Sequence, residues 1–257
     1  MSSFANQQIF GEAAGWNVWD VNVRVGPSGP HGQVGMSKTE LLEEMSSFFI
    51  QKAVAAHGTG VEYDAAVGNE ALARTEDPRL IPAWTPLPDR ESVEHLAKRR
   101  PKAVRLMPKN LNHSYPLTAW GAGELFEYLQ SHQVVTLVAR EDIDWEPLVD
   151  LLENFPRLPL VLLDIGYRFD HYIVPLLQRF PSLHFDSATY LAYRQLENFV
   201  DRHGGERLLF GSRLPLFTPA TALGVMASAR IPDEARLQIA GGNLRRLLEA
   251  AQNGAAR

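Results

Sequence analysis

The chain has 257 residues, a mass of 28.7 kDa, a formal net charge of −5, a pI near 5.9 and no cysteine. Without cysteine there are no disulfides, thiolate metal sites or cysteine nucleophiles, and the negative charge argues against a general nucleic-acid-binding protein. With 45% hydrophobic and 21% charged residues, the chain can bury a substantial core. No apolar run approaches the roughly 20 residues that span a bilayer, and the first ten residues carry no basic side chain. We therefore expect a soluble, cytoplasmic globular protein without a secretory signal.

Strand-like and helix-like segments alternate along the chain, which is typical of parallel βα units. In the first half, the expected elements are, in chain order, a strand over 18–25, a helix over 38–49, a strand over 51–57, a helix over 62–74 and an irregular strand over 80–87. Ser37 and Glu40 have the spacing of a capping box for the first of these helices. A loop rich in glycine and proline separates that helix from the first strand.

The second half continues this alternation. Its expected strands cover 102–107, 134–139, 158–163, 183–186 and 207–210, and its expected helices cover 118–132, 145–154, 170–180, a segment ending near 202, and the remainder of the chain. Eight strands with intervening helices favour an α/β fold of the (β/α)8 TIM-barrel type, and we expect residues 1–257 to form a single domain. A doubly wound open sheet is the main alternative. Its phosphate loop needs backbone N–H donors where this chain has Pro27 and Pro30.

The active site of a TIM barrel lies at the C-terminal ends of its strands. The polar residues expected there include Asn22, Arg24, His57, Arg105, Lys109, His113, Arg140, Asp164, Arg168, Asp186, Ser187, Ser212 and Arg213, with Trp84 and Tyr167 as candidate aromatic walls. Because guanidinium groups bind carboxylate or phosphate through two parallel hydrogen bonds, the group of arginines predicts an anion site. The alternative is that some of the arginines pair with Asp164, Asp186, Asp142 or Asp144 and only hold loops together.

Five segments carry motifs that can be compared with known families. They are Asp20-Val21-Asn22-Val23-Arg24, Lys102 to Pro108 (KAVRLMP), Leu162 to Gly166 (LLDIG), Arg207 to Pro215 (RLLFGSRLP) and Gly242 to Leu248 (GNLRRLL). Together they resemble the amidohydrolase-2, or amidohydrolase-related, branch of the amidohydrolase superfamily. The resemblance spans about Val18 to Leu248 and implies a barrel like that of the metal-dependent hydrolases.

The metal-binding positions depart from that family pattern. The resemblance implies a divalent metal held by two first-strand histidines, histidines after strands five and six, and an eighth-strand aspartate. This chain instead has Asn22, Arg24, Arg140 or a neighbouring residue, Asp164 and Arg213 at those positions. Arginine keeps its proton and repels a divalent cation, and zinc-like metals need imidazole or carboxylate ligands. We therefore expect no inherited metal site and no cofactor.

The candidate catalytic residues are Asp164, His113 and His57, because carboxylate and imidazole groups transfer protons near neutral pH. Each also has a structural interpretation: Asp164 as the partner of an arginine, and His57 as a buried histidine that ends an apolar strand. The expected substrate-binding residues are Arg24, Asn22, Arg105, Arg213, Arg140 and Trp84.

These residues, with the resemblance, predict a metal-independent hydrolase or decarboxylating lyase that acts on a small carboxylated substrate. Two alternatives stay open. One is a non-catalytic barrel that binds a small anion or serves as a scaffold. The other is a metal-dependent hydrolase with unorthodox ligands such as His57, His113 and Asp164. The expected partner is a small anionic molecule, with neither nucleic acid nor membrane, and the sequence leaves open whether the chain forms a homo-oligomer.

Overall fold

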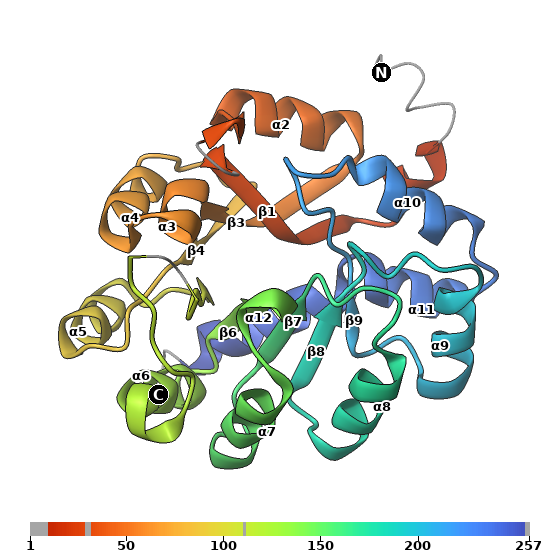
Figure 1. Ribbon diagram of the computed structural model, residues 1–257. Helices are drawn as coiled ribbons and strands as arrows, with labels where there is room; N and C mark the ends of the chain where they lie inside the picture. Colours follow the sequence, from red (N-terminus) through yellow and green to blue (C-terminus); the bar gives the residue numbers. More distant parts are fainter. Residues whose placement is uncertain (1–9, 29–31, 110–111, 255–257) are drawn as a thin grey trace.

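A computed structural model describes residues 10–28, 32–109 and 112–254 of the chain as a curled sheet surrounded by helices (Figure 1). Consecutive parallel strands pair in chain order: β1 (Val18–Ser28), β3 (Ile50–His57), β4 (Leu80–Trp84), β5 (Ala103–Arg105), β6 (Val135–Ala139), β7 (Leu160–Leu163), β8 (Leu183–Asp186) and β9 (Leu208–Leu209). These are the eight parallel strands of a TIM barrel, which confirms the predicted fold class.

The barrel closes between its first and last strands. The backbone N–H of Val21 donates to the carbonyl of Phe210 at 3.0 Å, and the N–H of Arg24 donates to the carbonyl of Leu214 at 2.8 Å. A parallel bridge joins Val23 and Leu214 between these two bonds. The chain after β9 therefore completes the ring, and it carries the eighth-strand motif to the C-terminal end of β1.

Helices follow the strands on the outside of the barrel (Figure 1). They are α2 (Lys38–Ser47), α3 (Gly58–Glu62), α4 (Ala65–Ala73), α5 (Arg90–Arg99), α6 (Ala119–Ser131), α7 (Trp145–Asn154), α8 (Asp170–Arg179), α9 (Gln195–His203), α10 (Pro219–Ser228), α11 (Asp233–Leu237) and α12 (Asn243–Gly254). Shorter helical turns are η1 (Gly11–Gly15), η3 (Arg140–Asp142) and η4 (Gln238–Gly242). Across the described part of the chain, no helix is both long and apolar enough to span a bilayer.

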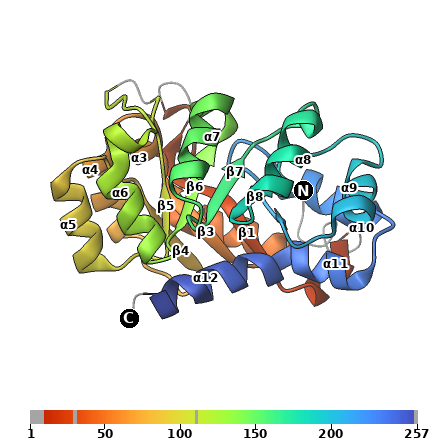
Figure 2. The same ribbon diagram turned by 90° about the horizontal axis from the view of Figure 1, so that it is seen from below.

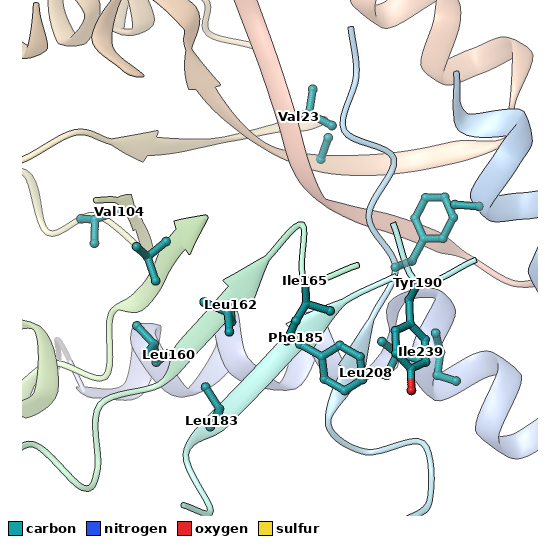
Figure 3. Close-up of a cluster of buried hydrophobic side chains, with 14 of the residues drawn as sticks. Val23, Val104, Leu160, Leu162, Ile165, Leu183, Phe185, Tyr190, Leu208 and Ile239 are labelled. Carbon is teal, nitrogen blue, oxygen red and sulfur yellow. The ribbon is translucent and has the colours of Figure 1, made fainter. Parts of the chain in front are cut away.

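Alternate residues of each strand face two separate apolar layers, as the two-residue repeat of a strand requires. On β7, Leu160 and Leu162 point outward to the helices (Figure 3), whereas Val161 and Leu163 point into the barrel. The N-terminal end of the barrel is closed by α12, which runs beneath the strands (Figure 2) and adds leucines such as Leu247 to the interior cluster. The interior of the barrel is therefore filled from below, at the N-terminal end of the strands.

Several local expectations are confirmed and others are corrected. The capping box is present: Ser37 Oγ accepts from the N–H of Glu40 at 3.3 Å, and the Ser37 N–H donates to Glu40 Oε2 at 2.8 Å. The helix expected over 62–74 is present as α4 and begins three residues later, because Asp64 caps it, while the short helix α3 precedes it.

The strand β2 (Val34–Met36) and the helix α5 are among the elements that the sequence did not indicate. Part of the expected first loop is this short strand, which pairs antiparallel with the end of β1. The helix α5 was not predicted because few of its residues are apolar, although Asp89 caps it by accepting from the N–H of Ser92 at 2.7 Å. The third barrel strand also ends early, at Trp84, before the prolines at 86 and 88.

Candidate active site

The centre of the C-terminal end is a hydrogen-bonded cluster around Asn22 of β1. Its Nδ2 donates to Asp164 Oδ1 at 2.9 Å and to Asp186 Oδ2 at 2.8 Å. The backbone N–H of Asp164 donates to the other oxygen of Asp186 at 2.9 Å. A single amide therefore connects the ends of β1, β7 and β8, and two carboxyl groups lie close together in the barrel.

Arg213 provides the positive charge beside this cluster. Its Nε lies 3.2 Å from Asp164 Oδ2, and its Nη2 lies 3.6 Å from Glu141 Oε1. The guanidinium also lies over the ring of Phe217, 5.2 Å from the ring centre. Since the Asp164 side chain is only 5% exposed, the pair with Arg213 is largely shielded from solvent.

The other two arginines at this end differ in how well they are paired. Arg24 Nη1 lies 2.7 Å from Glu62 Oε1, in a close ion pair. Arg105 is 3% exposed, and its Nη2 is 4.0 Å from the nearest carboxylate oxygen, Oδ2 of Asp142. Neither Nε nor Nη2 of Arg105 has a hydrogen-bond partner among the described residues. Arg105 is therefore a buried cation with unused donors.

The space for a ligand at the barrel mouth is a cavity of about 210 Å³. It is lined by Arg24, Val61, Glu62, Met107, Lys109, Glu141 and Asp142. Below it, a void of about 10 Å³ is shared by Asn22, Arg24 and Arg105, which is room for a single water molecule at most. Arg24 lines both spaces, so a ligand in the larger cavity can reach Arg24 directly, whereas Arg105 lines only the small void and lies 4.0 Å from Asp142 of the cavity wall.

Burial changes the protonation of the acids in the cluster. It raises the pKa of Asp20 to about 7, and burial followed by the charge of Asp164 raises the pKa of Asp186 to about 8. Burial also raises the pKa of Asp142, which the nearby Arg105 partly offsets. Burial, together with the charge of Arg24, lowers the pKa of Arg105. The buried carboxyl groups of Asp20 and Asp186 therefore keep their protons to a higher pH than an ordinary aspartate does.

The structure places the expected substrate-binding residues in three different settings. Asn22, Arg24 and Arg105 line the deep void, and Arg24 also lines the cavity above it. Arg213 lies beside the void, held by Asp164. Asn22, Arg24 and Arg105 thus share the small void, and Asp164 and Arg213 are joined to it through the contacts of Asp164 with Asn22 and with Arg213.

Two of the expected binding residues lie elsewhere, and the assignments are corrected. Arg140 donates to the carbonyl of Ile143 and lies over the ring of Trp145, at 4.2 Å, because η3 turns its side chain away from the barrel axis. Trp84 faces outward, since Ala83 occupies the inward position of β4. Its ring packs beneath Arg99 of α5, 4.4 Å away.

The expected catalytic residues also separate. Asp164 joins the central cluster, but His57 packs against the backbone of Gly26, where an added Cβ would lie 2.4 Å from its Nε2. Burial lowers the pKa of His57, and its Nδ1 has no hydrogen-bond partner among the described residues. His113 is half-buried in the loop after β5 and does not line the cavity at the mouth. Neither His57 nor His113 lines the cavity at the barrel mouth.

Sequence reasoning missed the importance of the carboxylates that line the cavity. Asp142 was considered only as a partner for an arginine, and Glu62 was not singled out at all. Glu62 comes at the end of the short helix α3, whose position could not be read from the pattern. A carboxylate three residues after a strand end was the available signal for Asp142.

The residues present do not fit a divalent metal. Within the described ranges, no group of three or more histidine, aspartate or glutamate side chains is arranged to hold one. The oxygens of Asp164 instead face the Asn22 amide and the Arg213 guanidinium, both of which are hydrogen donors. A metal ion there would be repelled by a charge that cannot be neutralised. The alternative of His57, His113 and Asp164 as ligands lacks the clustering it needs.

Comparisons with known proteins agree with this fold. The model of the amidohydrolase family (Amidohydro_2) matches residues 27–250, and the chain therefore belongs to this family. A comparison with curated protein sequences gives no match.

Solved structures are similar in fold at low sequence identity. An uncharacterized TIM-barrel protein from Bordetella bronchiseptica has a TM-score of 0.72 at 16% identity, over 91% of this chain and 100% of that one. The 5-carboxyvanillate decarboxylase of Sphingomonas paucimobilis has a TM-score of 0.69 at 14% identity, over 91% and 99%. A dihydroxybenzoic acid decarboxylase from Polaromonas sp. JS666, with bound manganese and the inhibitor 2-nitroresorcinol, has a TM-score of 0.71 at 11% identity, over 91% and 97%.

Proposed function

We propose that this chain is a metal-independent enzyme that binds a small carboxylate at the barrel mouth and releases its carboxyl group as CO2. Membership of the amidohydrolase family supports an enzymatic role. The likeness to proteins named as decarboxylases of aromatic acids favours this reaction over hydrolysis of a carboxylated substrate. The expected substrate is a small aromatic or unsaturated acid.

The single observation that carries the proposal is the buried guanidinium of Arg105, whose Nε and Nη2 have no hydrogen-bond partner among the described residues and whose carboxylate neighbour, Asp142, is 4.0 Å away. Leaving a buried polar group unpaired costs about 1–3 kcal/mol, and more when the group is charged. A ligand carboxylate held between Arg105 and Arg24 would accept hydrogen bonds from both. Each charge-assisted hydrogen bond contributes about 1.5–3 kcal/mol. The site thus gains most from a ligand that brings its own negative charge.

The cavity also limits the size and character of the ligand. Its volume of about 210 Å³ lies below the roughly 300–1,000 Å³ of sites for drug-sized ligands, so the ligand is small. Val61 and Met107 provide apolar surface for a carbon skeleton, opposite the charged side chains. The residues beside Asp164 do not fit a divalent ion. The negative charge that develops on the substrate during the reaction is therefore stabilised by the cationic side chains of the cavity, Arg24 and Lys109.

Calorimetric titration with benzoate and its uncharged analogue benzamide tests the binding part. Wild type is expected to prefer benzoate, and Arg24→Ala and Arg105→Met are each expected to weaken benzoate binding about 10- to 150-fold. Arg24→Lys keeps the charge but loses the planar fork, so it recovers only part of the affinity. The exposed Arg90→Ala on α5 is the control. Equal affinities for benzoate and benzamide in wild type would contradict the proposal.

Release of CO2 from 5-carboxyvanillate and from dihydroxybenzoates tests the reaction part. We expect turnover that survives dialysis against a chelator and is not increased by manganese or zinc. Turnover that is lost with the chelator and restored by one of these metals would exclude the metal-independent mechanism. Carboxylate binding without turnover of any of these acids would instead support the non-catalytic alternative. The ion pairs that Arg24 and Arg213 already form with Glu62 and Asp164 are consistent with that alternative.

A further inference from the structure

The carboxyl group of Asp142 occupies a distinct place in the cavity wall. It ends η3, directly after β6, and its side chain is 23% exposed toward the cavity that Arg24 and Lys109 also line. Its nearest cationic atom, Nη2 of Arg105, is 4.0 Å away. Asp142 is therefore a partly buried acid that lines the cavity, and among the described residues its ion pair is the long contact with Arg105.

The other carboxylates near the mouth are engaged or turned outward. Glu62 is held by Arg24 at 2.7 Å. Glu141 is 66% exposed and lies toward Arg213. Asp164 is 5% exposed and divides its oxygens between Asn22 and Arg213. Of these acids, Asp142 alone combines access to the cavity with burial and a loose partner.

We infer that Asp142 is the proton donor to the substrate in this cavity, an inference that rests on the carboxylate-decarboxylating function proposed above. Arg24 and Asp142 both line this cavity, and Arg105 lies 4.0 Å behind Asp142, so a carboxylate bound to Arg24 would place its carbon skeleton within reach of Asp142. The expected catalytic residues Asp164, His57 and His113 do not line this cavity. The assignment thus replaces them with a residue that does.

The charged groups around Asp142 oppose one another in their effect on its proton. Arg105 of β5, Arg24 of β1 and Lys109 of the following loop favour the ionised form, whereas burial and the neighbouring Glu141 favour the protonated form. Burial is the largest effect, and it raises the pKa of Asp142. The buried hydroxyl of Tyr115, which accepts from the N–H of Met107, also faces this group. An acid whose pKa is raised toward the working pH is a more effective donor than an ordinary aspartate.

The proposed step balances without a further reactant. The bond between the substrate's carbon and its carboxylate breaks, and CO2 leaves without the electron pair. That pair stays on the carbon and forms a new C–H bond with the proton of the Asp142 carboxyl group. Asp142 becomes a carboxylate and regains a proton from water before the next turnover.

A pH titration of the side-chain carboxyl 13C resonances tests the inference without any substrate. Asp142→Asn identifies the Asp142 resonance by its loss, and Glu146→Gln, an exposed acid of α7, is the matched control that leaves this resonance in place. We expect the Asp142 signal to titrate clearly above the ordinary aspartate value of about 3.9. A midpoint at or below that value overturns the inference, whatever the activity of the protein.

Turnover of 5-carboxyvanillate or a dihydroxybenzoate gives the second measurement. Asp142→Asn is expected to lower kcat about 100-fold or more, with benzoate affinity within threefold of wild type, and Glu146→Gln to keep both values. The alkaline limb of the kcat–pH profile is expected to vanish in Asp142→Asn. If that variant keeps a third or more of the wild-type kcat, Asp142 is not the donor although the proposed function stands. If wild type releases no CO2, the proposed function fails, and the proton-donor role fails with it.

Discussion

The Nε atom of Arg213 lies 3.2 Å from Oδ2 of Asp164, and this pair joins the end of β9 to the end of β7 across the barrel mouth. Both residues have a left-handed backbone, with φ of +61° and +57°. For residues other than glycine such conformations cost about 1–3 kcal/mol and persist only where surrounding contacts impose them. The ion pair and the hydrogen bond from Asn22 to Asp164 provide contacts of this kind. Arg213 thus supplies an internal positive charge where a metal does not fit.

Removal of that charge should destabilise the fold. We expect Arg213→Ala to lower the free energy of unfolding by about 2–3 kcal/mol, below the 3–5 kcal/mol of a fully buried pair because Arg213 is 20% exposed. Arg213→Lys should restore part of the loss. Urea unfolding measures both. The double variant Arg213→Ala with Asp164→Asn is expected to be more stable than Arg213→Ala, since no unpaired carboxylate remains. A double variant with the full sum of the two losses would contradict this account.

The barrel could be predicted from the sequence because most of its strands are short, largely apolar and separated from the next by a helix. The run Leu158 to Leu163 indicates a strand buried on both faces, and the structure confirms it as β7. Where local signals were weak the prediction failed. The polar helix α5 and the short strand β2 depend on contacts with neighbours that composition does not reveal.

The site was harder to predict, because the direction of a side chain depends on strand register and on turns. Trp84 and Ala83 differ by one position, and that difference sends the tryptophan to the outside of the barrel. Arg140 follows β6 directly, but the turn η3 places Asp142 rather than Arg140 at the cavity. The pairing of Asn22 with Asp164 joins residues 142 positions apart, which no local pattern can indicate.

The glycine of the eighth-strand motif should be intolerant of a side chain. A Cβ at Gly211 would lie 2.5 Å from Oδ2 of Asp186, the oxygen that accepts from Asn22. Gly211→Ala must therefore displace this carboxyl group, and overpacking of this kind costs about 1–3 kcal/mol. Urea unfolding should detect the loss. Gly123→Ala on α6, where a Cβ meets nothing within 4 Å, is the control and should not be destabilised.

The buried carboxyl group of Asp20 should make stability depend on pH. Its pKa is about 7 in the folded protein, because of burial, and about 3.9 when unfolded. Between these values the folded state keeps a proton that the unfolded state releases, so stability due to this group falls as pH rises from about 4 to about 7. The slope is at most about 1.4 kcal/mol per pH unit.

Asp20→Asn should remove this dependence at little structural cost. Asp20 Oδ1 accepts from the N–H groups of Asn22 and Ser212, which an asparagine oxygen can also do, and Oδ2 has no hydrogen-bond partner among the described residues. Relative to wild type, we expect the variant to gain about 2–3 kcal/mol between pH 5 and pH 8. Urea unfolding at both pH values measures the gain. The exposed Asp201→Asn should show none, and parallel pH curves for Asp20→Asn and wild type would refute the assignment.

The ion pair between Arg24 and Glu62 should compete with a bound anion. At 2.7 Å, Glu62 engages the guanidinium that the proposed carboxylate also needs, and Arg24 lines the cavity from below. Glu62→Gln removes the competing charge but keeps a side chain of similar size. We expect it to strengthen benzoate binding about 3- to 10-fold, which corresponds to roughly 0.6–1.4 kcal/mol. The effect should be smaller at high salt, since mobile ions screen the pair and the ligand alike. Glu70→Gln removes the acid of an exposed pair with Arg74, outside the mouth, and should leave binding unchanged. Calorimetric titration of all three proteins at low and moderate salt decides the matter. If Glu62→Gln weakens benzoate binding, Glu62 holds Arg24 in the orientation that the ligand needs, and the competition argument is wrong.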